Sequence, residues 1–108
     1  MHMSEHTHRY KLILTYDIDG DVQDNYFQFM VGEMVPAVQA QGLQMSGAWH
    51  TAYGEYPMRL VEFIAEDQDS IETLLDTPLW QDMERRLRGF VTNYSKKIVR
   101  LRDDQFQF

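Results

Sequence analysis

One histidine and one glutamate inside this 108-residue sequence have the types and spacing needed for acid–base chemistry. His50 lies in the segment Leu43 to Tyr53 and Glu62 in the segment Met58 to Ala65, and both segments alternate side chains as strands do. In a hairpin that joins their apolar sets on one face, His50 and Glu62 share the other face, about 4.5–8 Å apart at Cβ. This register puts Met45, Trp49 and Tyr53 beside Val61, Phe63 and Ala65.

The predicted pair has several interpretations. A histidine beside a carboxylate is a typical general base near neutral pH, and it is also a typical haem or metal ligand with an orienting acid. The pair can equally be a structural hydrogen bond at a subunit contact, or two exposed residues. Arg100 on the last predicted strand either forms an ion pair with Glu62 or faces solvent. Trp49 and Tyr16 are candidates for lining a ligand pocket, as are Tyr26, Tyr53 and Tyr94, although aromatic residues at such spacing are often core.

Several kinds of site are excluded by what the sequence lacks. It has no cysteine, which excludes disulfides, thiolate nucleophiles, zinc ribbons and iron–sulfur clusters. It also lacks a G-x-G-x-x-G fingerprint, a P-loop, an H-x-x-x-H pair and a G-x-S-x-G elbow, and the acidic run at 66–69 lacks the spacing of an EF-hand loop. His2, His6 and His8 lie in a polar start without a preorganised geometry. We therefore expect no cofactor and no metal site.

Charge is distributed unevenly along the chain. The net charge is −7, yet residues 85–108 contain seven of the ten Lys and Arg residues, which leaves the first 84 residues strongly acidic. An acidic surface disfavours binding to nucleic acid, and the basic end suits the last turns of a helix followed by an edge strand. No apolar run approaches the roughly 18 residues of a membrane span, and no signal-peptide pattern follows the start. We expect a soluble, cytoplasmic protein without nucleic-acid or membrane partners.

Periodicity predicts six elements in one domain of residues 9–102, with polar tails at 1–8 and 103–108. A strand at 10–18 precedes a helix at 22–41 that Asp21 caps, that Pro36 kinks and that Gly42 ends. Strands at 43–53 and 58–65 form a hairpin around a turn at 54–57. A capping-box-like start at Asp69 leads to a short helical turn, and Thr77 and Pro78 begin a longer helix that Asn93 closes. The last strand covers 94–101.

This order gives an α+β fold of the ferredoxin-like type, a βαββαβ chain with a four-stranded antiparallel sheet and two helices on one face. The second face is too apolar to be simply wet, because Met58, Leu60 and Ile64 lie on it. Burying an aliphatic side chain contributes roughly 1.5–3 kcal/mol, and large apolar patches usually mark interfaces. We therefore expect a homodimer that forms through the open sheet face.

The chain resembles the dimeric α+β barrel superfamily over residues 9–102. The resemblance rests on the element order, the chain length and the pattern TPLWQDMERRL at Thr77 to Leu87, followed by a basic strand at Lys96 to Arg102. Members include NIPSNAP-like proteins, antibiotic-biosynthesis-type monooxygenases and stress-responsive barrels. The resemblance implies a pocket between helices and sheet or within the barrel, without a universal catalytic motif to carry over.

Three functions remain open at this point, and whether the protein is an enzyme is one of the open questions. The first is binding of a small apolar or aromatic molecule. The second is a cofactor-independent monooxygenase or isomerase that acts on an aromatic or polyketide-like substrate with His50 as its base. The third is haem binding through His50.

Overall fold

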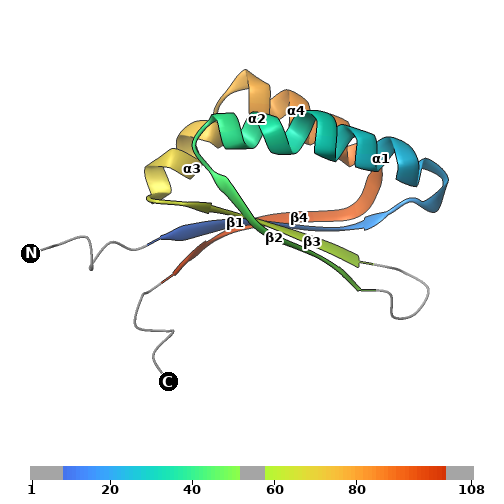
Figure 1. The fold of residues 1–108 in the computed structure, drawn as a ribbon, viewed down its shortest axis with the longest axis horizontal. Helices are drawn as coiled ribbons and strands as arrows, with labels where there is room; N and C mark the ends of the chain where they lie inside the picture. Colours follow the sequence, from blue (N-terminus) through green and yellow to red (C-terminus); the bar gives the residue numbers. More distant parts are fainter. Residues whose placement is uncertain (1–8, 52–57, 102–108) are drawn as a thin grey trace, which may run out of the picture.

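The fold is a two-layer arrangement of one antiparallel sheet under a layer of helices (Figure 1). The structure is a computed structural model and describes residues 9–51 and 58–101. The strands have the order β2-β3-β1-β4, with bounds β1 Tyr10–Ile18, β2 Gln44–Thr51, β3 Met58–Ala65 and β4 Val91–Arg100. The predicted ferredoxin-like arrangement is confirmed, with all helices on one face.

The two central strands divide their side chains between the faces as the sequence predicts. Along β1 every second residue from Leu12 to Ile18 is buried under the helices, and along β3 the same is true of Val61, Phe63 and Ala65. The other phase of each strand faces away from the helices. The observed register of β1 and β3 has no irregularity, and the alternation of apolar residues was sufficient to identify the buried face of each strand.

One continuous helical segment covers the sheet from Gly20 to Ala40. It consists of a 3-10 turn η2 (Gly20–Val22), α1 (Gln23–Phe29), a π-helical turn η3 (Met30–Met34) and α2 (Val35–Ala40). Its cap is Asp19, whose side chain accepts a hydrogen bond from the Asp21 N–H, so the predicted cap at Asp21 is wrong by two residues. The helix ends before Gly42, which has a φ of 100° and so fits the predicted stop.

The predicted kink near Pro36 takes the form of the π-helical turn. In a regular helix the ring of Pro36 would crowd the carbonyl of Gly32. In the structure the Val35 N–H donates to the carbonyl of Met30, five residues back, which widens the turn immediately before Pro36. The helix therefore passes the proline without breaking, and the wide turn faces the sheet with Met30 and Met34, which are buried.

The second helical region contains two helices. In α3 (Gln68–Leu75) the side chain of Asp67 caps the helix by accepting from the Ser70 N–H at 2.7 Å, so the predicted start at Asp69 is two residues late. In α4 (Pro78–Arg88) Thr77 caps and Pro78 occupies the first turn, as predicted. The interior of α4 places Trp80 in the core with only 1% of its surface exposed.

Two irregularities in the edge strands differ from the predictions. In β2 the partner of Met45 is Phe63 and the partner of Gly47 is Glu62, so one extra residue interrupts the alternation. Asn93 does not close a helix, because α4 ends at Arg88 and β4 begins at Val91. Asn93 instead has a φ of 56° where the β1–β4 register shifts. Each bulge reverses the facing of the residues that follow it.

The predicted tails at 1–8 and 103–108 and the predicted turn at 54–57 lie outside the described residues. Among the helices of the described part, none is long and apolar enough to cross a membrane.

Candidate functional site

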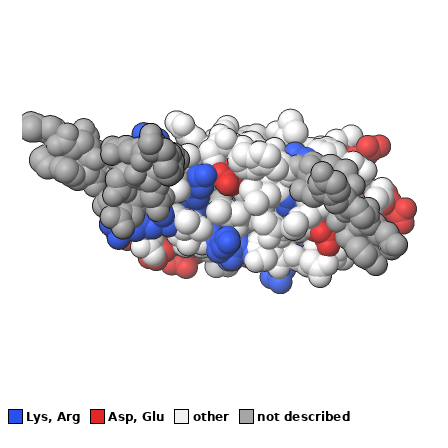
Figure 2. Space-filling view, turned by 90° about the horizontal axis from the view of Figure 1, so that it is seen from below, with Lys and Arg blue, Asp and Glu red and all other residues white. Residues whose placement is uncertain are grey.

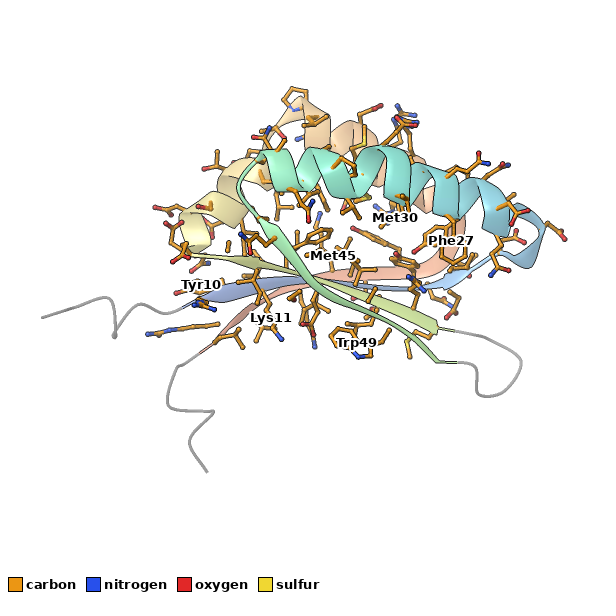
Figure 3. All side chains as sticks on the ribbon, viewed as in Figure 1. Tyr10, Lys11, Phe27, Met30, Met45 and Trp49 are labelled. Carbon is orange, nitrogen blue, oxygen red and sulfur yellow. The ribbon has the colours of Figure 1, made fainter. Side chains whose placement is uncertain are left out.

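A cavity of about 160 Å³ lies between the first helical segment and strands β2 and β3. We call it the helix-side pocket. Figure 3 shows three of its residues, Phe27, Met30 and Met45, in the space between helix and sheet. Its lining consists of Tyr26, Phe27, Met30, Val31, Val35, Met45, Arg59 and Val61.

Local backbone irregularities help to shape this pocket. The π-helical turn contributes Met30 and Val31 to the lining, and Val35 follows directly after it. Turns of this kind occur frequently at functional sites. Val31 is 73% exposed, so the pocket opens to solvent beside it. On the sheet side Met45 is the last residue of β2 before the bulge.

Arg59 is the charged residue of the helix-side pocket, and it was missed in the sequence. It belongs to the same phase of β3 as Val61 and Phe63, which are buried under the helices. Its guanidinium carbon lies 5.2 Å from the centre of the Phe27 ring, a cation–π arrangement. Its Nε atom is buried and has no hydrogen-bond partner in the described structure. The signal was an arginine in the apolar phase of a strand, because a buried charge is costly unless it is paired.

Tyr26 brings a hydroxyl to the pocket, and Tyr16 holds that hydroxyl in place. The two hydroxyl oxygens are 2.6 Å apart, and both residues are 1% exposed. Burial raises the pKa of Tyr16 far above its usual range, and the neighbouring Tyr26 raises it further. Burial also raises the pKa of Tyr26, although its hydrogen bond with Tyr16 and the charge of Arg59 oppose that shift. Both phenols are therefore un-ionised at physiological pH, and one of them donates to the other.

Tyr94 extends this group toward the opposite edge of the sheet. Its ring stacks on Tyr16 with centroids 6.3 Å apart, and its hydroxyl donates to the Glu84 carboxylate at 2.8 Å. Burial raises the pKa of Tyr94, and the hydrogen bond to Glu84 adds to that effect. Burial alone would raise the pKa of Glu84, but hydrogen bonds from Lys96 and Tyr94 lower it. The three predicted pocket tyrosines that the structure describes thus divide into one lining residue, Tyr26, and two supporting residues, Tyr16 and Tyr94.

The predicted register of His50 and Glu62 is wrong. The Cα of His50 is paired with Arg59, whereas Glu62 is paired with Gly47, so the two positions differ in phase. The bulge after Met45 causes this difference, because the extra residue reverses the alternation. The side chain of His50 lies outside the described part of the structure.

Glu62 has other partners on the open face of the sheet. Its carboxylate pairs with the ammonium of Lys11 at 2.7 Å and accepts a hydrogen bond from Ser46 at 3.3 Å. Arg100 does not form an ion pair with Glu62. Its Cα is paired with Tyr10, which is in the phase opposite to that of Glu62, and its side chain is exposed. The interpretation in which Arg100 faces solvent is therefore correct.

Trp49 lies on the open face and not among the apolar residues under the helices, where the sequence placed it. Its Cα partner is Leu60, and its side chain is 51% exposed. The indole ring crosses the backbone of Gly47, where a Cβ atom would overlap it. Figure 3 shows Trp49 and Lys11 on the side of the sheet away from the helices. Tyr53, the remaining predicted pocket residue, lies outside the described residues.

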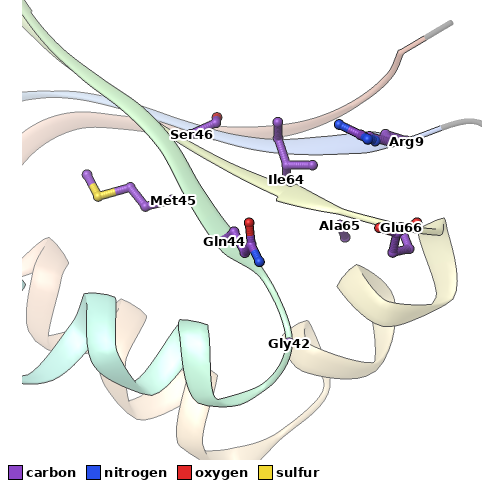
Figure 4. A pocket seen from close by; sticks show the side chains of 8 residues that line it. All are labelled: Arg9, Gly42, Gln44, Met45, Ser46, Ile64, Ala65 and Glu66. Atoms are coloured by element: carbon purple, nitrogen blue, oxygen red, sulfur yellow. The ribbon is translucent and has the colours of Figure 1, made fainter. Parts of the chain in front are cut away.

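A second cavity of about 190 Å³ lies where β2 begins and β3 ends (Figure 4). Its polar side chains, Arg9, Gln44, Ser46 and Glu66, are all exposed. Exposed polar groups are already hydrated, so they gain little from a ligand. The helix-side pocket is the better candidate, because its polar groups are partly or fully desolvated.

The described residues offer no preformed metal site. Within 9–51 and 58–101, no group of three or more His, Asp or Glu side chains is arranged to hold an ion. The predicted absence of a metal site in the tail concerns His2, His6 and His8, which lie outside the described residues.

The fold and this pocket between helices and sheet define a class of small α+β proteins. No protein-family model matches the sequence, and a comparison with curated proteins found no significant match. Solved structures with the same fold include a NIPSNAP family protein from Agrobacterium tumefaciens, with 21% identity, a TM-score of 0.62 and coverage of 95% of this chain and 93% of that one. Another is a NIPSNAP family protein of unknown function from the same bacterium, with 16% identity, a TM-score of 0.66 and coverage of 90% and 91%.

A NIPSNAP domain protein from Burkholderia xenovorans is also similar, with 15% identity, a TM-score of 0.63 and coverage of 83% of this chain and 91% of that chain. These likenesses confirm the fold that the resemblance to dimeric α+β barrels implied. At such identities they carry the fold and no activity.

The buried tyrosines predict a loss of stability in alkali. Tyr16, Tyr26 and Tyr94 have raised pKa values in the folded state, so the unfolded chain releases their protons first, above about pH 10. The unfolding free energy should be unaffected by these groups below that pH and should fall as the pH rises above it. Each group contributes a slope of up to about 1.4 kcal/mol per pH unit.

Urea unfolding at a series of pH values measures this slope. Tyr16→Phe and Tyr94→Phe should each flatten the fall, because each removes one such proton, even if the variant starts from a lower stability. A slope that is identical in wild type and both variants would contradict the assignment.

Proposed function

We propose that this protein binds a small, mainly apolar molecule in the helix-side pocket. The observation that carries the proposal is the cavity itself, which joins an aromatic and aliphatic lining to a few convergent polar groups. That combination is typical of small-molecule sites. An engineered apolar cavity of about 150 Å³ takes benzene, so a pocket of about 160 Å³ suits a single ring or a short branched chain.

The size of the pocket also distinguishes haem binding from the two functions that involve a single aromatic ring. A haem contains four pyrrole rings in one macrocycle, and a space suited to one ring does not favour it. A single aromatic ring is compatible with both the binding function and the enzymatic alternative.

The second candidate function is a cofactor-independent monooxygenase or isomerase that acts on an aromatic substrate with His50 as general base. One observation favours it: the Cα of His50 is the register partner of Arg59, a lining residue of the pocket. Val61, another lining residue, is paired with Ala48, which lies two residues before His50 on β2. Glu62 has no part in this proposal, because it pairs with Lys11 on the other face.

We also propose that the protein is a homodimer that forms through the open face of its sheet. Figure 2 views the molecule from that side, where uncharged side chains occupy much of the described surface. Its apolar residues are Ile13, Trp49, Met58, Leu60, Ile64 and Val99. Trp49 and Met58 are 51% and 46% exposed in the single chain. A second sheet would cover them together with the Lys11–Glu62 ion pair, whose side chains are only 24% and 13% exposed in the single chain.

Binding in the pocket predicts a local pattern of methyl shifts. Met30 and Met45 line the pocket, whereas Met83 belongs to α4 and Met58 to the open face. Toluene added to protein labelled with ¹³C at the methionine methyl groups should shift the signals of Met30 and Met45 and leave those of Met58 and Met83 in place. Val35→Phe should weaken toluene binding at least tenfold, because its ring would occupy the cavity.

Leu79→Phe is the matched control, since Leu79 is exposed on α4 and does not line the pocket. It should leave toluene binding unchanged. A shift confined to Met58, or no shift at saturating toluene, would contradict the proposed pocket.

The enzymatic alternative predicts turnover without any added cofactor. Wild-type protein in air should convert an anthrone- or quinol-type substrate, and His50→Ala should lower kcat by roughly 10²–10⁴-fold, the usual contribution of a general base. Glu62→Gln should retain the wild-type rate, because Glu62 lies on the other face. Absence of turnover in the wild type, or equal rates in wild type and His50→Ala, would reject the alternative and leave the binding function.

The dimer predicts that one charge on the open face separates the subunits. Leu60 lies between Thr15 of β1 and Trp49 of β2. Sedimentation should give twice the chain mass for wild type and the chain mass for Leu60→Arg. Lost burial of roughly 2 kcal/mol in each copy raises the dimer Kd by at least about a hundredfold. Leu79→Arg, an exposed apolar position among the helices, should remain dimeric. A monomeric wild type at micromolar concentration would contradict the proposal.

A further inference from the structure

We propose that the helix-side pocket selects small organic acids, with Arg59 binding the carboxylate and the apolar wall receiving a ring or short chain. This inference rests on the proposed function and adds the chemical class of the ligand. It is carried by the position of one guanidinium among apolar side chains.

Arg59 stands where a strand normally places an apolar residue. Its phase on β3 is that of Val61, and its guanidinium lies over the Phe27 ring, so one of its faces is already covered. Its Nε–H is buried without an acceptor in the described structure. An unsatisfied buried donor is unfavourable, and a carboxylate satisfies a guanidinium better than any neutral group, because it accepts two charge-assisted hydrogen bonds in one plane.

The protein itself supplies no negative charge to this arginine in the described part of the chain. The ion pairs among residues 9–51 and 58–101 use Lys11, Arg85, Arg86 and Lys96 as cations, and none of them includes Arg59. The neighbouring polar group is the phenol of Tyr26, which lines the pocket, accepts a hydrogen bond from Arg59 and carries no charge because burial raises its pKa. A bound carboxylate would supply the negative charge that Arg59 lacks among the described residues.

The preference for an anion must come from Arg59 inside the pocket, because the charge of the whole molecule is negative. The net charge of −7 repels anions at a distance, and salt screens that repulsion beyond about 10 Å. Inside the pocket the distance to Arg59 is short and water is partly excluded, so the nearby cation dominates. The cavity volume of about 160 Å³ limits the ligand to an acid of roughly the size of benzoate.

A pair of ligands with one shape and different charge tests the inference. Benzoate and benzamide should both shift the methyl signals of Met30 and Met45, and benzoate should bind wild type at least tenfold more tightly. Arg59→Met keeps an apolar chain of similar reach without the charge, and it should remove the preference by weakening benzoate binding tenfold or more, with benzamide changed less than threefold. Arg100→Met is the matched control, because Arg100 is an exposed cation on edge strand β4, and it should leave both affinities unchanged.

The wild-type comparison and the Nε–H resonance of Arg59 keep the test decisive if Arg59→Met does not fold. Benzoate should move that resonance downfield, and benzamide should move it less. Equal binding of benzoate and benzamide to wild type, or binding of toluene without benzoate, overturns the acid selectivity and leaves the pocket proposal intact. If none of toluene, benzamide and benzoate moves the Met30 and Met45 signals, the proposed pocket and the inference fail together.

Discussion

The molecule depends on one constraint: its helices cover a single face of a four-stranded sheet, and every strand must divide its residues between that face and the open one. Because successive side chains along a strand point to opposite faces, odd-numbered residues lie on one face and even-numbered residues on the other. Each inserted residue therefore changes the face of everything that follows it. Both candidate features of the protein, the pocket under the helices and the apolar open face, are results of this division.

The sequence was sufficient where alternation runs without interruption. For β1 and β3 the apolar phase identified the buried residues, and the structure pairs the two strands without a bulge. It was not sufficient for β2, because nothing in the residues 44–51 states that an extra residue separates the partners of Met45 and Gly47. The glycine there is a weak marker, since glycine also accommodates the indole of Trp49. The predicted pairing of His50 with Glu62 depended entirely on that register.

Arg59 is the charged residue in the otherwise apolar phase of β3, and that exception to the pattern indicates a functional position. A strand whose alternate residues Val61, Phe63 and Ala65 are all buried places Arg59 in the same phase, so its charge had to meet the helix layer. The candidate catalytic residues in the sequence were a histidine and a glutamate, and the cation in the apolar phase of β3 was not among them. The helix next to this arginine was also only partly predictable: Pro36 indicated a distortion, but it did not specify that the distortion is a π-helical turn.

The partly buried position of Arg59 affects stability and function in different ways. Removing part of a guanidinium from water is unfavourable, and the ring of Phe27 offsets that cost only in part. An apolar residue at this position would pack against Val61 and Met45 without an unsatisfied donor, and replacements of buried charges by apolar residues are often stabilising. The arginine is therefore hard to explain by the needs of the fold. Because Leu60 and Glu62 occupy the opposite phase of the same strand, a substitution at Arg59 leaves the composition of the open face unaltered, and a substitution at Leu60 leaves the pocket lining unaltered. If a substitution at Arg59 changes the ligand preference and leaves the subunit assembly unchanged, the arginine is retained for the pocket and not for the interface.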